Sequence, residues 1–266
     1  MTMTPLQNPL TDAHIHLEKG PYTVEWTERF IAEAVRKNIG EIRLLEHCYL
    51  FPEFVPMYDG LRSRNGFIDS WLGRKAGRRN LTEYLHLADE IRRRNYPVKI
   101  RFGLEVCYLE GYESFVRQQT RPLGLDFLAG SVHFAGDFAF DHTPELWQGR
   151  NVDTVYRQYF RTAIALADSG LFDGMAHPDS ICLYGHTPAY SLADSHNTLA
   201  KKLAEKHMYA EQNSGTARRC PDTAHFGMNP ALLAVMKKYN VQLITASDAH
   251  RPEDVGEGVP ELAETL

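Results

Sequence analysis

Residues 11–16 read Thr-Asp-Ala-His-Ile-His (TDAHIH), and they place three ionisable side chains in what the neighbouring apolar residues predict to be a strand. Residues two apart on a strand point to the same face, so His14 and His16 would present two imidazoles to one point. Burying such groups is costly unless a metal ion or strong pairing offsets the cost. We therefore expect this strand to end in a functional site, with Asp12 orienting one of the imidazoles rather than binding a metal.

Six further apolar runs predict strands, and amphipathic segments between them predict helices. The predicted strands cover residues 10–16, 42–47, 98–108, 127–134, 174–177, 208–213 and 241–247. The predicted helices cover residues 24–37, 81–94, 152–169, 192–206 and 229–239. This alternation calls for a parallel sheet with right-handed crossovers, either open or closed into a barrel. Because nearly every predicted strand ends in His, Glu or Asp, and barrels collect their chemistry at strand ends, the pattern favours an α/β barrel.

No long linker or repeat divides the chain, so we expect one domain over residues 1–266. Residues 49–80 break the alternation of strands and helices with a segment rich in aromatic and basic residues. Its length and composition suggest a lid over the strand ends, and the alternative is an ordinary surface insertion with solvated charges.

Composition narrows the class of protein. The formal net charge is -5, which gives no overall basic field for binding nucleic acid. The four cysteines form no CxxC pair, which argues against a disulfide framework and is consistent with a reducing cytoplasm. The N-terminal residues lack the pattern of a secretory signal and no run of 18 apolar residues occurs, so we expect a cytoplasmic protein without a membrane span. The sequence does not indicate an oligomeric state.

The other predicted strand ends also carry candidate metal ligands. In chain order they are Glu46 and His47, Glu105, His133, His177 and Asp179, Glu211 and Asn213, and Asp248 and His250. Each residue alone is a weak signal, but together they predict a site for divalent metal ions. Imidazoles combined with carboxylates favour Zn, Mn or Fe.

Six short motifs, DAHIH, LLEHC, GLEVCY, SVHF, AHPD and SDAH, resemble those of the polymerase and histidinol phosphatase (PHP) superfamily in the same order. The resemblance implies a distorted (β/α)7 barrel with two or three divalent metal ions at the C-terminal strand ends. It extends over almost the whole chain and is strongest to the stand-alone L-histidinol-phosphate phosphatases, which also carry an insertion after the second strand. It therefore implies hydrolysis of L-histidinol phosphate, a late step of histidine biosynthesis.

The resemblance also implies a set of ligands. His14, His16, Glu105 and Asp248 would hold a first metal, and Glu105 would bridge to a second one held by His133 and His177. His47 and His250 would hold a third. Where many relatives have a further histidine this chain has Tyr22, and we expect Glu18 to replace it as a ligand.

A phosphate ester needs further groups. Clustered cations would neutralise its oxygens and activate a water molecule, with Asp248 as a candidate proton acceptor and His250 as a candidate donor. The loop NSGTARR resembles one in which the family carries an arginine, which makes Arg218 the first candidate for binding phosphate. Arg161 on a predicted helix is a weaker candidate, because solvated helix charge is the commoner role.

Alternatives remain open at this stage. The substrate could be a nucleotide or another small phosphate ester, although the negative charge disfavours long nucleic acid. An amidohydrolase-like barrel is disfavoured because SVHF stands where a bridging lysine is often found. A non-catalytic metal-binding domain would be expected to have lost several ligands. Histidines outside the motifs, His142 among them, are expected to be surface or structural residues.

Overall fold

The computed structural model describes residues 10–266, in which each strand pairs in parallel with the next one along the chain. The strands are β1 (Leu10–Ile15), β2 (Ile39–His47), β3 (Lys99–Cys107), β4 (Phe127–Ser131), β5 (Gly174–Met175), β6 (Tyr209–Asn213) and β7 (Gln242–Ala246). All seven predicted strands are present. Residues 1–9, which belong to the predicted domain and to the expectation of no signal sequence, lie outside the described residues.

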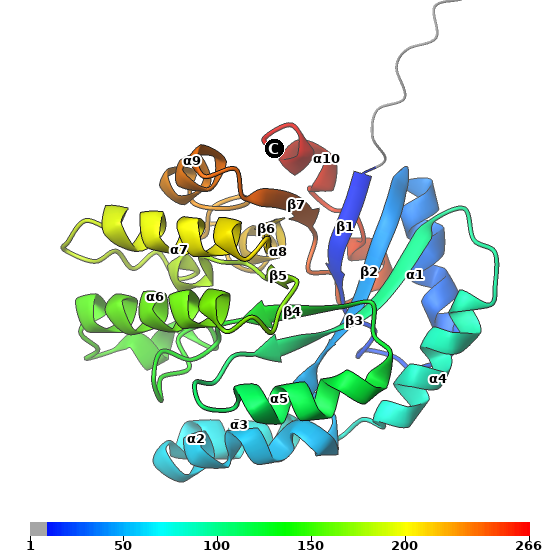
Figure 1. Ribbon diagram of the computed structural model, residues 1–266, viewed down its shortest axis with the longest axis horizontal. Coiled ribbons are helices and arrows are strands. Elements are labelled where there is room, and N and C mark those ends of the chain that lie inside the picture. Colours follow the sequence, from blue (N-terminus) through cyan, green and yellow to red (C-terminus); the bar gives the residue numbers. More distant parts are fainter. Residues whose placement is uncertain (1–9) are drawn as a thin grey trace, which may run out of the picture.

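The last strand returns to the first. The backbone N–H of His16 donates to the carbonyl of Ala249 at 2.8 Å, and the N–H of Ala249 donates to the carbonyl of His14 at 3.2 Å. This contact almost closes the sheet into a barrel, with the helices outside it (Figure 1). The predicted distorted (β/α)7 barrel is confirmed.

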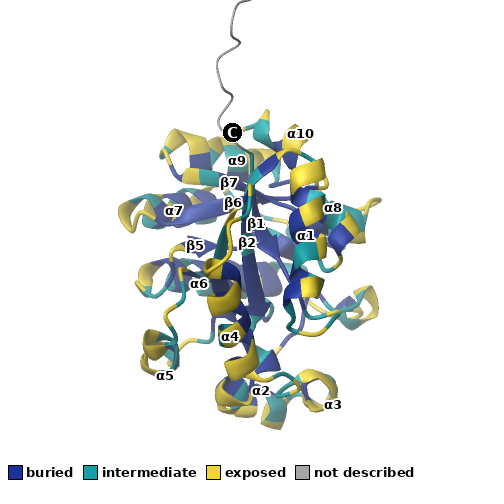
Figure 2. Ribbon diagram, turned by 90° about the vertical axis from the view of Figure 1, so that its right-hand side faces the viewer, coloured by how far each residue is buried: buried dark blue, intermediate teal, exposed yellow. Residues whose placement is uncertain are grey.

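Most of the α-helices of the described residues lie outside the barrel (Figure 1). They are α1 (Val24–Arg36), α2 (Asp59–Arg64), α3 (Gly66–Lys75), α4 (Leu81–Arg92), α5 (Glu113–Thr120), α6 (Val152–Asp168), α7 (Ala193–Glu205), α8 (Gly215–Arg219), α9 (Pro230–Lys238) and α10 (Val259–Ala263). The side chains of Asn80, Asn151 and Asn229 cap α4, α6 and α9 by accepting from first-turn N–H groups. Figure 2 shows buried strands inside and exposed helix surfaces outside, the pattern expected of amphipathic helices.

The insertion (residues 49–80) follows β2 directly. It contains 3-10 helix over Pro52–Tyr58, followed by α2 and α3. Phe51, Phe54 and Tyr58 are fully buried and anchor it to the core. Two of its arginines donate to side chains within the insertion, Arg62 to Asp69 and Arg74 to Ser70, whereas Arg79 donates to the backbone carbonyl of Glu18. No helix between residues 10 and 266 is long and apolar enough to cross a membrane.

Candidate metal centre

The end of β1 brings two imidazoles together. His14 and His16 are fully buried, and their Nε2 atoms lie 2.8 Å apart. Two nitrogen atoms that converge in this way, far from water, require either a proton or a cation between them. Burial disfavours a charged imidazole, but the carboxylates of Glu211 and Asp248 outweigh this and raise the pKa of His14.

Glu105, from β3, lies at the centre of the site. Its Oε1 atom lies 2.9 Å from Nε2 of His133 and 3.1 Å from Nε2 of His177. Its Oε2 atom lies 2.6 Å from Nδ1 of His47, and 3.6 Å from Nε2 of both His14 and His16. Although burial favours a neutral carboxyl group, the surrounding histidines lower the pKa of Glu105 well below its usual value. One buried carboxylate is thus shared among five histidines.

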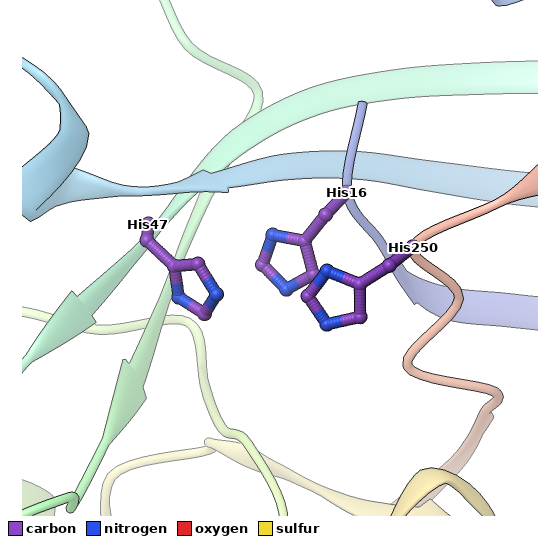
Figure 3. Close-up of side chains that lie close together, drawn as sticks. All are labelled: His16, His47 and His250. Carbon is purple, nitrogen blue, oxygen red and sulfur yellow. The ribbon is translucent and has the colours of Figure 1, made fainter. Parts of the chain in front are cut away.

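Asp248 and His250 complete the site from the segment after β7. Oδ1 of Asp248 lies 3.6 Å from Nε2 of both His14 and His16, and 3.4 Å from Nε2 of His250. The rings of His47 and His250 both stack against His16, with centroids 4.1 and 4.5 Å from its own and 5.9 Å from each other (Figure 3). Asp248 has a positive φ of 53°, a left-handed conformation that is uncommon for a residue with a side chain and is one of the strained conformations that cluster at functional sites.

Glu18 reaches the same cluster. Its Oε1 atom lies 3.1 Å from Nδ1 of His250. Tyr22 instead packs with Tyr84, at a centroid distance of 5.4 Å, and beneath the guanidinium group of Arg79. The carboxylate that was expected to compensate for Tyr22 is therefore beside the predicted third metal site.

All nine predicted ligands lie in one connected set, which we call the histidine–carboxylate cluster. Its members are His14, His16, Glu18, His47, Glu105, His133, His177, Asp248 and His250. Three of its triads have ligand atoms within 4.8 Å of one another: His14, His16 and Glu105; His47, Glu105 and His133; and His16, His47 and His250. The metal-binding role of each residue stays a prediction.

Unpaired buried atoms test whether cations fit this cluster. Oε2 of Glu105 is buried and accepts no well-aligned hydrogen bond, although Nδ1 of His47 lies 2.6 Å away, and the buried Nε2 atoms of His14 and His16 face each other at 2.8 Å. Leaving such atoms unsatisfied is costly, and coordination of a cation by this cluster would relieve the cost. Imidazole nitrogens together with carboxylate oxygens form a donor set that suits divalent zinc, manganese or iron.

Carboxylates behind the histidines fix the orientation of the rings. Glu211 lies 3.0 Å from Nδ1 of His14, and Asp141 lies 2.6 Å from Nδ1 of His133. Burial opposes a charge on His133, but Asp141 and Glu105 raise its pKa to about 10. Such partners fix the tautomer of a metal-binding histidine and raise its basicity. Glu211 carried a sequence signal, a charged residue in an apolar strand; Asp141, in a loop, carried none.

The role predicted for Asp12 is wrong. Its carboxylate contacts no imidazole: it accepts from the N–H and the hydroxyl of Ser247, at 2.8 and 2.6 Å, and from the N–H of Gly256 at 2.7 Å. Asp12 therefore joins β1 to the segment after β7, and Glu211 takes the orienting role.

The two predicted phosphate ligands, Arg218 and Arg161, do not line the cavity over the cluster, and their role in binding phosphate stays a prediction. The guanidinium group of Arg218 donates to the backbone carbonyls of Ser247, at 2.9 Å, and Asp248, at 2.7 Å. Arg161 lines a separate cavity, together with residues of α2 and of the segment between β3 and α5. The arginine that lines the cavity of the cluster is Arg219, the residue after the predicted one.

The cavity over the cluster has a volume of about 390 Å³. Its wall includes four aromatic side chains: Tyr49, Tyr58 and Trp71 from the insertion, and Phe134 from the segment after β4. His142, expected to be a surface or structural residue, lines this cavity too, and its side chain is 12% exposed. The insertion thus contributes to the cavity through its aromatic residues and not through its basic ones.

Comparison with known sequences assigns the family. The sequence profile of the PHP domain matches residues 12–215. The chain belongs to the PHP family. A second profile, described as PHP-associated, matches residues 229–266 of this PHP protein.

Two individual relatives carry names that include histidinol-phosphatase. This PHP protein is 30% identical to the "Probable histidinol-phosphatase" of Deinococcus radiodurans, in an alignment spanning 59% of this chain and 60% of that protein. It is 23% identical to the "Histidinol-phosphatase" of Bacillus subtilis, over 92% of this chain and 95% of that one. Its fold is similar to that of the histidinol phosphate phosphatase of Lactococcus lactis, solved with Zn, L-histidinol and phosphate. That comparison gives a TM-score of 0.68 at 18% identity, covering 96% of this chain and 92% of that one.

Proposed function

We propose that this PHP protein is a metal-dependent phosphatase that hydrolyses L-histidinol phosphate to L-histidinol and inorganic phosphate in histidine biosynthesis. The observation that carries the proposal is the position of Glu105, shared among five histidines in a cavity that reaches solvent. The names of the Deinococcus and Bacillus relatives, and the ligands in the Lactococcus structure, support this substrate.

The cofactors in this proposal are two or three divalent cations, drawn from zinc, manganese and iron. His14, His16, Glu105 and Asp248 would hold the first, and Glu105, His133 and His177 the second. Glu18, His47 and His250 would hold a third. Such cations, when bound, neutralise phosphate oxygens and lower the pKa of water, so that a hydroxide nucleophile exists at neutral pH.

The protein's own residues position the ester and move protons. Arg219 and Thr216 line the cavity and are suited to hold phosphate oxygens. The bond from water oxygen to phosphorus forms as the bond from phosphorus to the histidinol oxygen breaks, and that oxygen then takes a proton. Asp248 and His250 keep their proposed roles as proton acceptor and donor, because their side chains are the most exposed of the cluster, at 24% and 29%.

The partners follow from the same proposal. The substrate is a small phosphate ester, and nucleic acid is not expected for a chain with a net charge of -5. All four cysteines are free in the structure, consistent with a protein that works in the cytoplasm.

The test is phosphate release by metal-loaded protein from L-histidinol phosphate, p-nitrophenyl phosphate and a nucleoside monophosphate. We expect a strong preference for L-histidinol phosphate that is lost in Glu105→Gln and kept in Glu83→Gln, which alters an exposed carboxylate on α4. A preference for the nucleotide would change the proposed substrate but leave the proposed phosphatase activity standing. No release from any ester, with metal bound, would leave a non-catalytic metal-binding protein.

A further inference from the structure

Asp141 connects the histidine–carboxylate cluster to a histidine that the proposed chemistry does not use. One carboxylate oxygen of Asp141 lies 2.6 Å from Nδ1 of His133, and the other lies 2.8 Å from Nδ1 of His142. A carboxylate can only accept in these two contacts, so the Nδ1 atom of each ring carries a hydrogen. In a neutral ring at His142, Nε2 is then left as a hydrogen-bond acceptor.

Nε2 of His142 is buried and has no hydrogen-bond partner. Since the ring lines the cavity, a ligand there can supply the missing donor. The three acidic side chains that line the cavity, Glu105, Asp141 and Asp248, already lie within ion-pair distance of histidines of the cluster. Nε2 of His142 and Nδ1 of His177 are the buried ring nitrogens of the cavity lining that lack a hydrogen-bond partner, and of these two residues only His142 lies outside the predicted metal ligands.

Aromatic rings lead from the cluster to this acceptor. Tyr49 stacks on His47 at 5.1 Å, Trp71 packs edge-on against Tyr49 at 5.0 Å, and His142 lies 4.5 Å from Trp71. Aromatic rings are favourable neighbours for organic cations, which are attracted to the electron-rich face. This part of the wall thus places aromatic surface beside a ring nitrogen that lacks a hydrogen-bond donor.

We propose that His142 and Trp71 form the subsite for the cationic half of the substrate, its ammonium or imidazolium group. Nε2 of His142 accepts a hydrogen bond from an N–H of that group, and Trp71 provides the aromatic surface beside it. This assignment rests on the proposed function, because p-nitrophenyl phosphate and other neutral-tailed esters have no such group. It gives the insertion a role in substrate selection, through a residue of α3.

The test is His142→Phe, which keeps an aromatic ring beside Trp71 and removes the acceptor. We expect kcat/KM for L-histidinol phosphate to fall by about 10- to 100-fold, mainly through KM, the size expected for one hydrogen bond to a charged group. Hydrolysis of p-nitrophenyl phosphate and the metal content should stay within about twofold of the unaltered protein. His86→Phe, at an exposed histidine of α4, is the matched control.

Calorimetric titration with L-histidinol, which has the cationic groups but no phosphate, gives a readout independent of turnover. We expect weaker binding in His142→Phe and also in Trp71→Leu, which guards against misfolding of one variant. An equal loss for both esters would mean that His142 acts through Asp141 and His133, and would overturn the subsite. No loss for either ester would overturn it as well. If the unaltered protein shows no preference for L-histidinol phosphate, the proposed function fails and the subsite with it.

Discussion

Nδ1 of His14 lies 3.0 Å from Oε1 of Glu211 in the buried interior of the barrel, on the side of the ring opposite the cluster. Glu211 also accepts from the backbone N–H of His177 at 3.2 Å and from the side-chain amide of Asn213 at 3.0 Å. A single carboxylate therefore sets the orientation of one predicted ligand and the backbone position of another.

Replacing Glu211 with Gln should weaken metal binding. The amide keeps the shape of the side chain but loses the charge that fixes the tautomer of His14, so we expect affinity to fall by about 10- to 100-fold. Titration of chelator-treated protein with zinc or manganese measures the change. Gln212→Glu would be a poor control because Gln212 is buried, so Glu83→Gln serves instead. Unchanged affinity would mean that Glu211 is only a structural residue.

A methyl group at Gly215 should displace Asp248. A Cβ atom built there would lie 2.4 Å from Cβ of Asp248, too close for the side chain to keep its place. A shift of about 1 Å at a reacting site costs on the order of 100-fold in rate, which we expect for kcat in Gly215→Ala. Gly73→Ala is the control, because nothing lies within 4 Å of its Cβ position on α3. Full activity in Gly215→Ala would argue against a role for Asp248 in the reaction.

Arg219 and Arg218 should behave differently when each is replaced with Ala. Loss of Arg219, which lines the cavity, should raise KM for the phosphate ester by about 10- to 100-fold, since a charged hydrogen bond is lost. Loss of Arg218 should instead lower metal affinity, because its guanidinium group holds the carbonyl of Asp248. Steady-state kinetics beside metal titration separates the two effects. The opposite pattern would support Arg218 as the phosphate ligand.

Asp12→Ala should destabilise the fold even without metal. Removing this carboxylate leaves the buried N–H groups of Ser247 and Gly256 without an acceptor, at a cost of about 1–3 kcal/mol for each. Urea unfolding of chelator-treated protein measures the free energy of unfolding. Asp89→Ala on α4, where the side chain is 62% exposed, should change it by less than about 0.5 kcal/mol. Equal effects of the two variants would contradict a joining role for Asp12.

Acid should destabilise the protein through His196 on α7. Burial lowers the pKa of His196 below its ordinary value of 6.5. Below that pH the unfolded chain binds a proton that the folded chain does not, so the free energy of unfolding falls as the pH drops. His196→Gln removes this contribution. The free energy of unfolding of the variant, relative to that of the unaltered protein, should therefore rise as the pH falls from 8 to 5. Urea unfolding at both values is the measurement, and a constant difference would contradict the prediction.

The barrel and the histidine–carboxylate cluster were predictable because both depend on local patterns. Apolar runs marked the seven strands, and residues that follow parallel strands must meet at one end of a barrel, as His16 and His47 do. Asp141 and His142 were not predictable, because they lie in the loop after β4, whose path depends on packing over the whole molecule. The choice between Arg218 and Arg219 depends on the direction of each side chain on the short helix α8, which the sequence does not specify.

Because β1 meets the segment after β7, the full set of cation ligands forms only when the barrel is complete. Glu18 and His250, in contact at the predicted third site, are 232 residues apart in the chain. In a partly folded chain whose last strand has not yet joined the sheet, His14 and His16 can be in place, but Asp248 and His250 cannot. Such a chain has only part of the donor set and binds a cation correspondingly weakly. Metal uptake during refolding should therefore follow barrel closure rather than precede it, so that cations stabilise only the finished molecule.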